Sequence, residues 1–187
     1  RGGVEANFPP RAPRRSTTRA GPPTACYACD MPPREHLVYT DGSCKAGPDG
    51  LRPGGWGYVV KSPTGAVLEG RGSAAATHAK VMEVRAVAEA LATLPEGAHA
   101  RVFSDNQGLV ATLQDKLADY RRSGFANVDP LLVEHLRAID ASVTARGLRV
   151  AFQWVRAHNG NAGNERADAL AAEGARAARD AARGERS

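Results

Sequence analysis

The chain has 187 residues, enough for one domain of ordinary size with flanking segments. Its hydrophobic content is 42%. No apolar run approaches the roughly 18–20 residues that a membrane-spanning helix needs, so we expect no membrane span. The net charge of +5 is a mild basic excess that permits a nucleic-acid partner without requiring one.

Most of the basic excess lies at the N-terminus. Residues 1–36 hold six arginines against three acidic residues, a net charge of +3, and the other 151 residues hold 19 basic and 17 acidic residues, a net charge of +2. Residues 1–35 are rich in Pro, Arg, Gly, Ser and Thr. Such a segment buries too little apolar surface to offset its ordering entropy. We therefore predict a disordered Pro/Arg-rich tail over residues 1–35.

Two features of this tail allow alternative interpretations. Met31 stands just before the first predicted strand, which favours translation starting there, with residues 1–30 as upstream or processed sequence. Cys26 and Cys29 form half of a zinc-ribbon pattern. His36 would add a third ligand, which still leaves the site one short of the four ligands that a structural zinc site needs. We favour two free thiols. Three cysteines without a secretion signal indicate a reducing compartment, so we expect a cytoplasmic protein.

The remaining chain predicts an α/β fold. Five segments are predicted to be strands, because they are rich in β-branched or aromatic residues and bounded by turns: residues 37–43, 54–62, 66–73, 100–105 and 148–155. Helices are predicted over residues 81–94, 108–121 and 130–145, and a last, Ala-rich helix has Asn164 as N-cap. This order indicates a mixed five-stranded sheet, an antiparallel meander followed by parallel strands, flanked by helices. The domain would cover residues 36–174, with residues 175–187 as an Ala/Arg-rich tail that frays into a solvated charged helix.

Four carboxylates fall at the ends of these elements. Asp41 and Asp105 end strands, and Gly42 and Ser43 are predicted to form the turn after Asp41. Glu83 and Asp168 lie on helices beside apolar positions. Each one alone has an ordinary explanation, such as capping a turn or favouring a helix dipole.

Together, the four acids predict a metal site. If the first and fourth strands are neighbours, the four carboxylates can meet at one end of the sheet, where they would repel each other. Hard oxygen ligands suit Mg²⁺, and two ions about 4 Å apart could support an in-line phosphoryl displacement.

Four motifs together resemble type 1 ribonuclease H over about residues 37–174. They are TDGSC (Thr40–Cys44), ME (Met82–Glu83), SDNQ (Ser104–Gln107) and HNGNAGNERADALA (His158–Ala171). The resemblance implies the ribonuclease H-like fold, and endonucleolytic cleavage of the RNA strand of RNA–DNA hybrids that leaves 5′-phosphate and 3′-hydroxyl ends. It also implies two Mg²⁺ ions per active site, with Mn²⁺ as a possible substitute.

The resemblance also implies a function for each site residue. Asp41 would bridge both metals, and Asp168 would complete the metal that activates the attacking water. Glu83 and Asp105 would hold the metal that stabilises the leaving 3′-oxygen. His158, on the loop before the last helix, would assist proton transfer or release of the product phosphate; a surface-loop histidine is the alternative interpretation.

Substrate contacts are implied at further positions. Residues near the metals would read the RNA strand, and an aromatic–basic segment would form the substrate-binding handle, unless that segment is only a solvated helix end followed by a core Phe125. These candidate residues are Gly42, Ser43, Cys44, Gln107, Asn164, Tyr120, Arg121 and Arg122.

Three departures from the family pattern bear on affinity. The usual Asn-rich stretch before the catalytic Glu is replaced by ATHAKVM, so His78 or Lys80 would have to take over its contacts. A glycine loop carries an insertion at residues 46–55, and the handle is short. The Arg-rich tail could compensate, which predicts weaker hybrid binding when residues 1–35 are removed.

A catalytically weak hybrid-binding module of the same fold is the alternative function. It is disfavoured because all four acids are present. We expect a monomer without a protein partner.

Overall fold

The computed structural model describes residues 35–44 and 51–184. The predictions for residues 1–34, including those for Cys26, Cys29 and Met31, fall outside this part of the chain, as does half of the predicted insertion, residues 46–50. In the described part, no helix is both long and apolar enough to cross a membrane.

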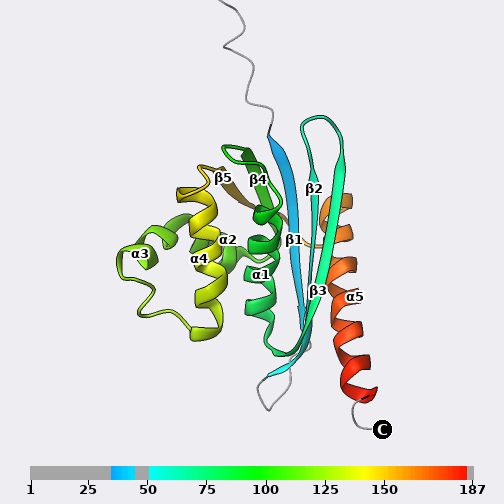
Figure 1. Ribbon diagram of the computed structural model, residues 1–187. Coiled ribbons are helices and arrows are strands. Elements are labelled where there is room, and N and C mark those ends of the chain that lie inside the picture. Colours follow the sequence, from blue (N-terminus) through cyan, green and yellow to red (C-terminus); the bar gives the residue numbers. More distant parts are fainter. Residues whose placement is uncertain (1–34, 45–50, 185–187) are drawn as a thin grey trace, which may run out of the picture. The chain divides into compact units, whose positions relative to one another are not determined.

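A mixed five-stranded sheet forms the centre of the domain, as predicted (Figure 1). Its strands are β1 (His36–Cys44), β2 (Arg52–Lys61), β3 (Val67–Thr77), β4 (His99–Ser104) and β5 (Arg149–Trp154), in the order β3-β2-β1-β4-β5. The first three strands pair antiparallel, and β4 pairs parallel with both β1 and β5. The first and fourth strands are therefore neighbours, as the argument for a shared acidic site requires.

Five helices complete the described part of the domain: α1 (Ala79–Ala92), α2 (Gln107–Asp115), α3 (Leu117–Arg122), α4 (Pro130–Thr144) and α5 (Ala162–Gly184). The prediction of one helix over residues 108–121 is wrong, because α2 and α3 are separate. Lys116, between them, has a φ of −114° and caps both helices. Leu113 and Leu117, on either side of the break, are both buried in the core.

The helices form a layer on each face of the sheet (Figure 1). α1 packs between the sheet and α4, and the main core lies there, around fully buried residues such as Val87, Leu91 and Ile139. α5 covers the other face over β1, β2 and β3, where Tyr39, Val59 and neighbouring residues form a smaller core. The acids of α1 and α5 thus approach β1 from opposite faces.

Glycines on β2 bring α5 close to the sheet. A Cβ atom at Gly57 would lie 2.6 Å from the carbonyl oxygen of Ala167, and one at Gly55 would lie 2.2 Å from the backbone nitrogen of Ala175. A larger side chain at either of these two positions would therefore push α5, and the acid it carries, away from the sheet.

Two predictions about α5 need correction. The chain after residue 174 is helical, as predicted, and α5 continues to Gly184, but Ala175 and Ala178 are buried, so this part of the helix is packed and not fully solvated. Its N-terminal cap is Asn161 instead of Asn164: the Asn161 Oδ1 atom accepts hydrogen bonds from the backbone N–H groups of Gly163 and Asn164. The alanines that suggest a solvated tail are small enough to pack against the sheet.

Candidate active site

Asp41 lies inside β1, and the prediction that a turn follows it is wrong. The strand continues to Cys44, because β2 remains paired with it through Gly42–Trp56 and Ser43–Gly55. Asp41 is buried, with 8% of its surface exposed. It is therefore a carboxylate held rigidly within a central strand.

Gly42 allows α1 to deliver Glu83 to Asp41. A Cβ atom at Gly42 would lie 2.3 Å from the backbone nitrogen of Glu83 and 2.6 Å from the carbonyl carbon of Met82. Only glycine permits this approach of helix to strand. The structure thus gives Gly42 a positioning function that the sequence motif does not reveal.

Asp105 follows β4 and completes a compact acidic cluster. One carboxylate oxygen from each of Asp41, Glu83 and Asp105 lies within 4.8 Å of the other two. Two side chains hold Asp105 from outside the cluster. The Trp154 indole N–H donates to the Asp105 carbonyl oxygen at 3.0 Å, and the Asn164 Nδ2 atom lies 3.4 Å from the Asp105 Oδ2 atom. The position of Asp105 therefore depends on both β5 and α5.

Burial and mutual repulsion disfavour the charged forms of two of these acids. Desolvation, followed by the charges of Asp105 and Asp168, raises the pKa of Asp41 to about 7. Desolvation, followed by the charges of Asp41 and Asp105, raises the pKa of Glu83 to about 9. The cluster therefore binds protons in the absence of another cation.

Asp168, half-buried on α5, acts on the opposite side of Asp41 from Glu83. Its charge, together with a hydrogen bond between the two carboxyl groups, contributes to the raised pKa of Asp41 but not to that of Glu83. Asp41 is therefore the shared neighbour of the other three acids. The structure brings all four predicted acids to one end of the sheet, on either side of β1.

The donor set fits a hard divalent cation. The Glu83 Oε2 atom is buried and has no hydrogen-bond partner among the described residues. A buried carboxylate oxygen without a partner is costly unless a cation binds it. The oxygens of Asp41 and Asp105 lie close by and are the ligand type that Mg²⁺ prefers.

Asn106 was not predicted from the sequence as a site residue. Its Oδ1 atom accepts from the Leu109 N–H at 3.0 Å and so caps α2, and its side chain also forms a hydrogen bond that favours the charged form of Glu83. One feature of the sequence does indicate the capping function of Asn106: it stands directly after Asp105, at the predicted start of a helix, where an asparagine is a favoured N-cap.

The other predicted residues differ in how exposed their side chains are. His158 is exposed, in a turn between β5 and α5, with a φ of 50°. Gln107 is exposed at the first position of α2. The Cys44 thiol is half-buried, 3.7 Å from the Thr77 carbonyl oxygen and 3.9 Å from that of Arg52, so it packs against the first residue of β2 and the last residue of β3.

A groove of about 590 Å³ lies beside the acids, between the N-terminal ends of α1 and α2 and the segment that joins α3 to α4. Asn106, which interacts with Glu83, also lines the groove and so joins it to the cluster. The other polar residues that line it are Lys80, Thr112, Tyr120, Asn127 and Asp129.

The predicted handle residues do not all face this groove. Tyr120 lines it, but Arg121 lies on the other side of α3, 3.3 Å from Asp140. Arg122 is paired with Asp119. Phe125 is buried in the core, as the alternative interpretation of this segment supposed.

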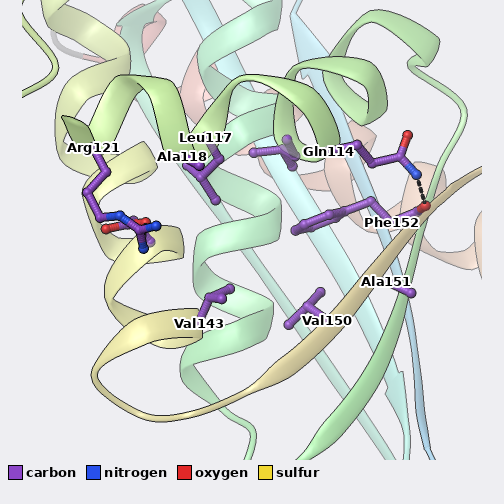
Figure 2. A pocket seen from close by; sticks show the side chains of 10 residues that line it. Gln114, Leu117, Ala118, Arg121, Val143, Val150, Ala151 and Phe152 are labelled. Carbon is purple, nitrogen blue, oxygen red and sulfur yellow. Dashed lines mark hydrogen bonds and ion pairs between the residues drawn. The ribbon is translucent and has the colours of Figure 1, made fainter. Parts of the chain in front are cut away.

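Arg121 lines a second hollow, of about 370 Å³, between α2, α3, α4 and β5 (Figure 2). Its wall is mostly apolar, with Leu117, Val143 and Val150 pointing inward, and the Gln114 amide donates to the Phe152 carbonyl oxygen of the edge strand. None of the clustered acids lines this hollow.

Comparisons with known proteins agree with this arrangement. The RNase H family profile matches residues 33–176. A relative named Ribonuclease H from Methylorubrum extorquens is 37% identical over 150 residues, which cover 79% of this chain and 63% of that protein, so the chain spans less than two thirds of its length.

Two solved structures have a similar fold. LC9-RNase H1, described as a type 1 RNase H with the type 2 active-site motif, is 26% identical with a TM-score of 0.64, over 78% of this chain and 74% of that chain. LC11-RNase H1, solved in complex with an RNA/DNA hybrid, is 24% identical with a TM-score of 0.58, over 77% of this chain and 99% of that chain.

Proposed function

Because this chain belongs to the ribonuclease H family, we propose that it cleaves the RNA strand of RNA–DNA hybrids in a metal-dependent reaction. The observation that carries this proposal is the cluster of Asp41, Glu83 and Asp105, with one oxygen of each within 4.8 Å of the others, and Asp168 beside Asp41. Acids that are all present and positioned together favour an enzyme over a binding module that has lost its chemistry.

The four acids would hold two Mg²⁺ ions, or Mn²⁺ in their place. When bound, such ions activate water and stabilise the charge on a leaving oxygen. Asp41 would be a ligand of both, because it is the common neighbour of Asp168 on one side and of Glu83 and Asp105 on the other. The buried, unpartnered Glu83 Oε2 atom supports a cation on that side.

The chain's own residues would place the scissile phosphodiester and move protons. His158, exposed on the loop that follows β5, is the side chain that we propose for proton transfer at the reacting oxygens. Hydrolysis would leave a 5′-phosphate and a 3′-hydroxyl. Ser43, Gln107 and Asn164 lie close in sequence to the acids and are candidates to contact the RNA 2′-hydroxyl.

The groove beside the acids would hold the backbone of the other strand. Lys80 supplies a positive charge, and Thr112, Asn106 and Asn127 supply neutral polar groups. Tyr120 offers an aromatic surface against a sugar or base. Arg121, paired with Asp140 in the other hollow, is not included in this contact surface.

Substrate choice and metal dependence test the proposal directly. The full chain is incubated with a labelled RNA–DNA hybrid, single-stranded RNA or double-stranded DNA, with Mg²⁺ and with chelator. We expect loss of RNA only from the hybrid and only with metal. Cleavage of duplex DNA, or of no substrate at all, would contradict the proposal.

A further inference from the structure

Three helix N-termini meet around the groove next to the acids. His78 is the N-cap of α1, Asn106 that of α2 and Asp129 that of α4, and residues from the starts of all three helices line the groove. None of these helices has an acidic residue in its first turn. With Lys80, the groove therefore offers a positive environment that suits a phosphate of the bound hybrid, an argument that rests on the function proposed above.

Asp129 opposes this environment. It is the only acidic residue among those that line the groove. One of its carboxylate oxygens accepts from the Leu131 N–H at 3.0 Å, and the other lies 3.5 Å from the His78 Nε2 atom. Both side chains are partly exposed, His78 by 35% and Asp129 by 43%, so solvent and ligand can reach the pair.

The pair links the two sides of the groove. His78 stands at the start of α1, five residues before Glu83, and its side chain makes no capping hydrogen bond to α1. A phosphate oxygen that enters beside Lys80 would compete with the Asp129 carboxylate for the same His78 N–H, and it would meet the negative charge of Asp129.

We propose that Asp129 limits the affinity of this protein for its hybrid by holding His78. On binding, His78 exchanges the Asp129 carboxylate for a phosphate oxygen of the strand in the groove. Asp129 is thus an affinity-determining residue and His78 the group through which it acts.

Asp129→Asn tests the proposal because asparagine keeps the N-cap of α4 and removes only the charge. We expect the Kd of the full chain for a hybrid, measured by fluorescence anisotropy in metal-free buffer, to fall about 3- to 10-fold at low ionic strength, and the gain to shrink as salt is added. The KM for hybrid cleavage should fall in parallel. Asp180→Asn, the same change on the exposed part of α5, should leave the Kd as it is.

His78→Ala completes the test. We expect it to weaken binding, and we expect Asp129→Asn to give a clearly smaller gain in its presence, because only the direct repulsion between Asp129 and the phosphate is then relieved. An Asp129→Asn protein that binds no more tightly than the unmodified chain would overturn the proposal, as would a gain of undiminished size when His78 is alanine. Failure of the unmodified chain to cleave hybrids would instead contradict the proposed function. The binding assay does not depend on cleavage, so the two outcomes can be distinguished.

Discussion

At the residue scale, the buried charge of Asp41 destabilises the folded protein when no cation is bound. It is buried in β1 and flanked by acids on both sides, which together raise its pKa to about 7. An asparagine has nearly the same shape and no charge. We therefore expect Asp41→Asn to abolish cleavage and, in chelator at pH 8, to raise the free energy of unfolding on the order of 1–3 kcal/mol.

Urea unfolding in chelator, together with the hybrid assay, checks both parts of this prediction. Asp180→Asn is the matched control, since it makes the same substitution at an exposed position and should change neither quantity. Residual cleavage close to that of the unmodified chain would show that Asp41 is not an essential ligand.

Trp154 controls the neighbouring acid through a single hydrogen bond. Its indole N–H donates to the Asp105 carbonyl oxygen, and phenylalanine would keep an aromatic ring at this position without that donor. We expect Trp154→Phe to raise the Mg²⁺ concentration for half-maximal activity about 2- to 10-fold, with activity recovered at high Mg²⁺. A lower maximal rate with unchanged Mg²⁺ dependence would point to a function other than positioning Asp105.

The four acids could be predicted from the sequence because each lies in a short motif that is visible locally. Trp154 and Asn106 were not, because their importance lies in contacts that local patterns do not contain. Trp154 is 49 residues from Asp105, and the contact exists only because β4 and β5 are parallel neighbours.

At the scale of elements, the distance between β1 and α1 depends on Gly42. Because a Cβ atom there would meet the backbone of Glu83, alanine must push α1 away from the strand. We expect Gly42→Ala to lower the free energy of unfolding by about 2–4 kcal/mol and to reduce cleavage strongly, since Glu83 moves with the helix.

Gly108→Ala is the stability control for Gly42→Ala. A Cβ atom at Gly108 would meet only the Asn106 Oδ1 atom, at the ordinary distance of 3.5 Å, and alanine is the better helix former. Its stability should be equal or higher. A Gly42→Ala protein as stable as the unmodified chain would mean that α1 can shift without cost.

The number of strands and their order along the chain could be predicted, because alternation and turn residues are local signals. The ends and breaks of the helices were less predictable. Lys116 is not a helix-breaking residue, yet α2 ends there, and Leu113 and Leu117 at i and i+4 fit one unbroken helix equally well, so the local pattern does not reveal the break. The packing of Ala175 likewise depends on Gly55, a residue 120 positions away.

At the scale of the whole molecule, the acidic cluster links stability to pH and to metal. The pKa values of Asp41 and Glu83 rise to about 7 and about 9 in the folded chain, so between about pH 4 and pH 9 the folded state binds more protons than the unfolded state. As far as these two groups are concerned, stability of the metal-free protein should therefore be highest at and below about pH 4, should fall as pH rises toward 9, and should level off above that.

Mg²⁺ should reverse this trend, because a cation replaces the protons that the cluster otherwise binds. At pH 6 the ion must displace protons from Asp41 and Glu83, whereas at pH 9 it meets carboxylates that repel each other. The increase in Tm caused by about 10 mM Mg²⁺ should therefore be larger at pH 9 than at pH 6. Thermal unfolding at both pH values, with Mg²⁺ and with chelator, measures this increase. The double variant Asp41→Asn, Glu83→Gln should lose both the pH trend and the Mg²⁺ effect, because it removes the two groups whose protons the metal displaces; a Mg²⁺ effect that survives in this variant would place the stabilising ion elsewhere on the protein.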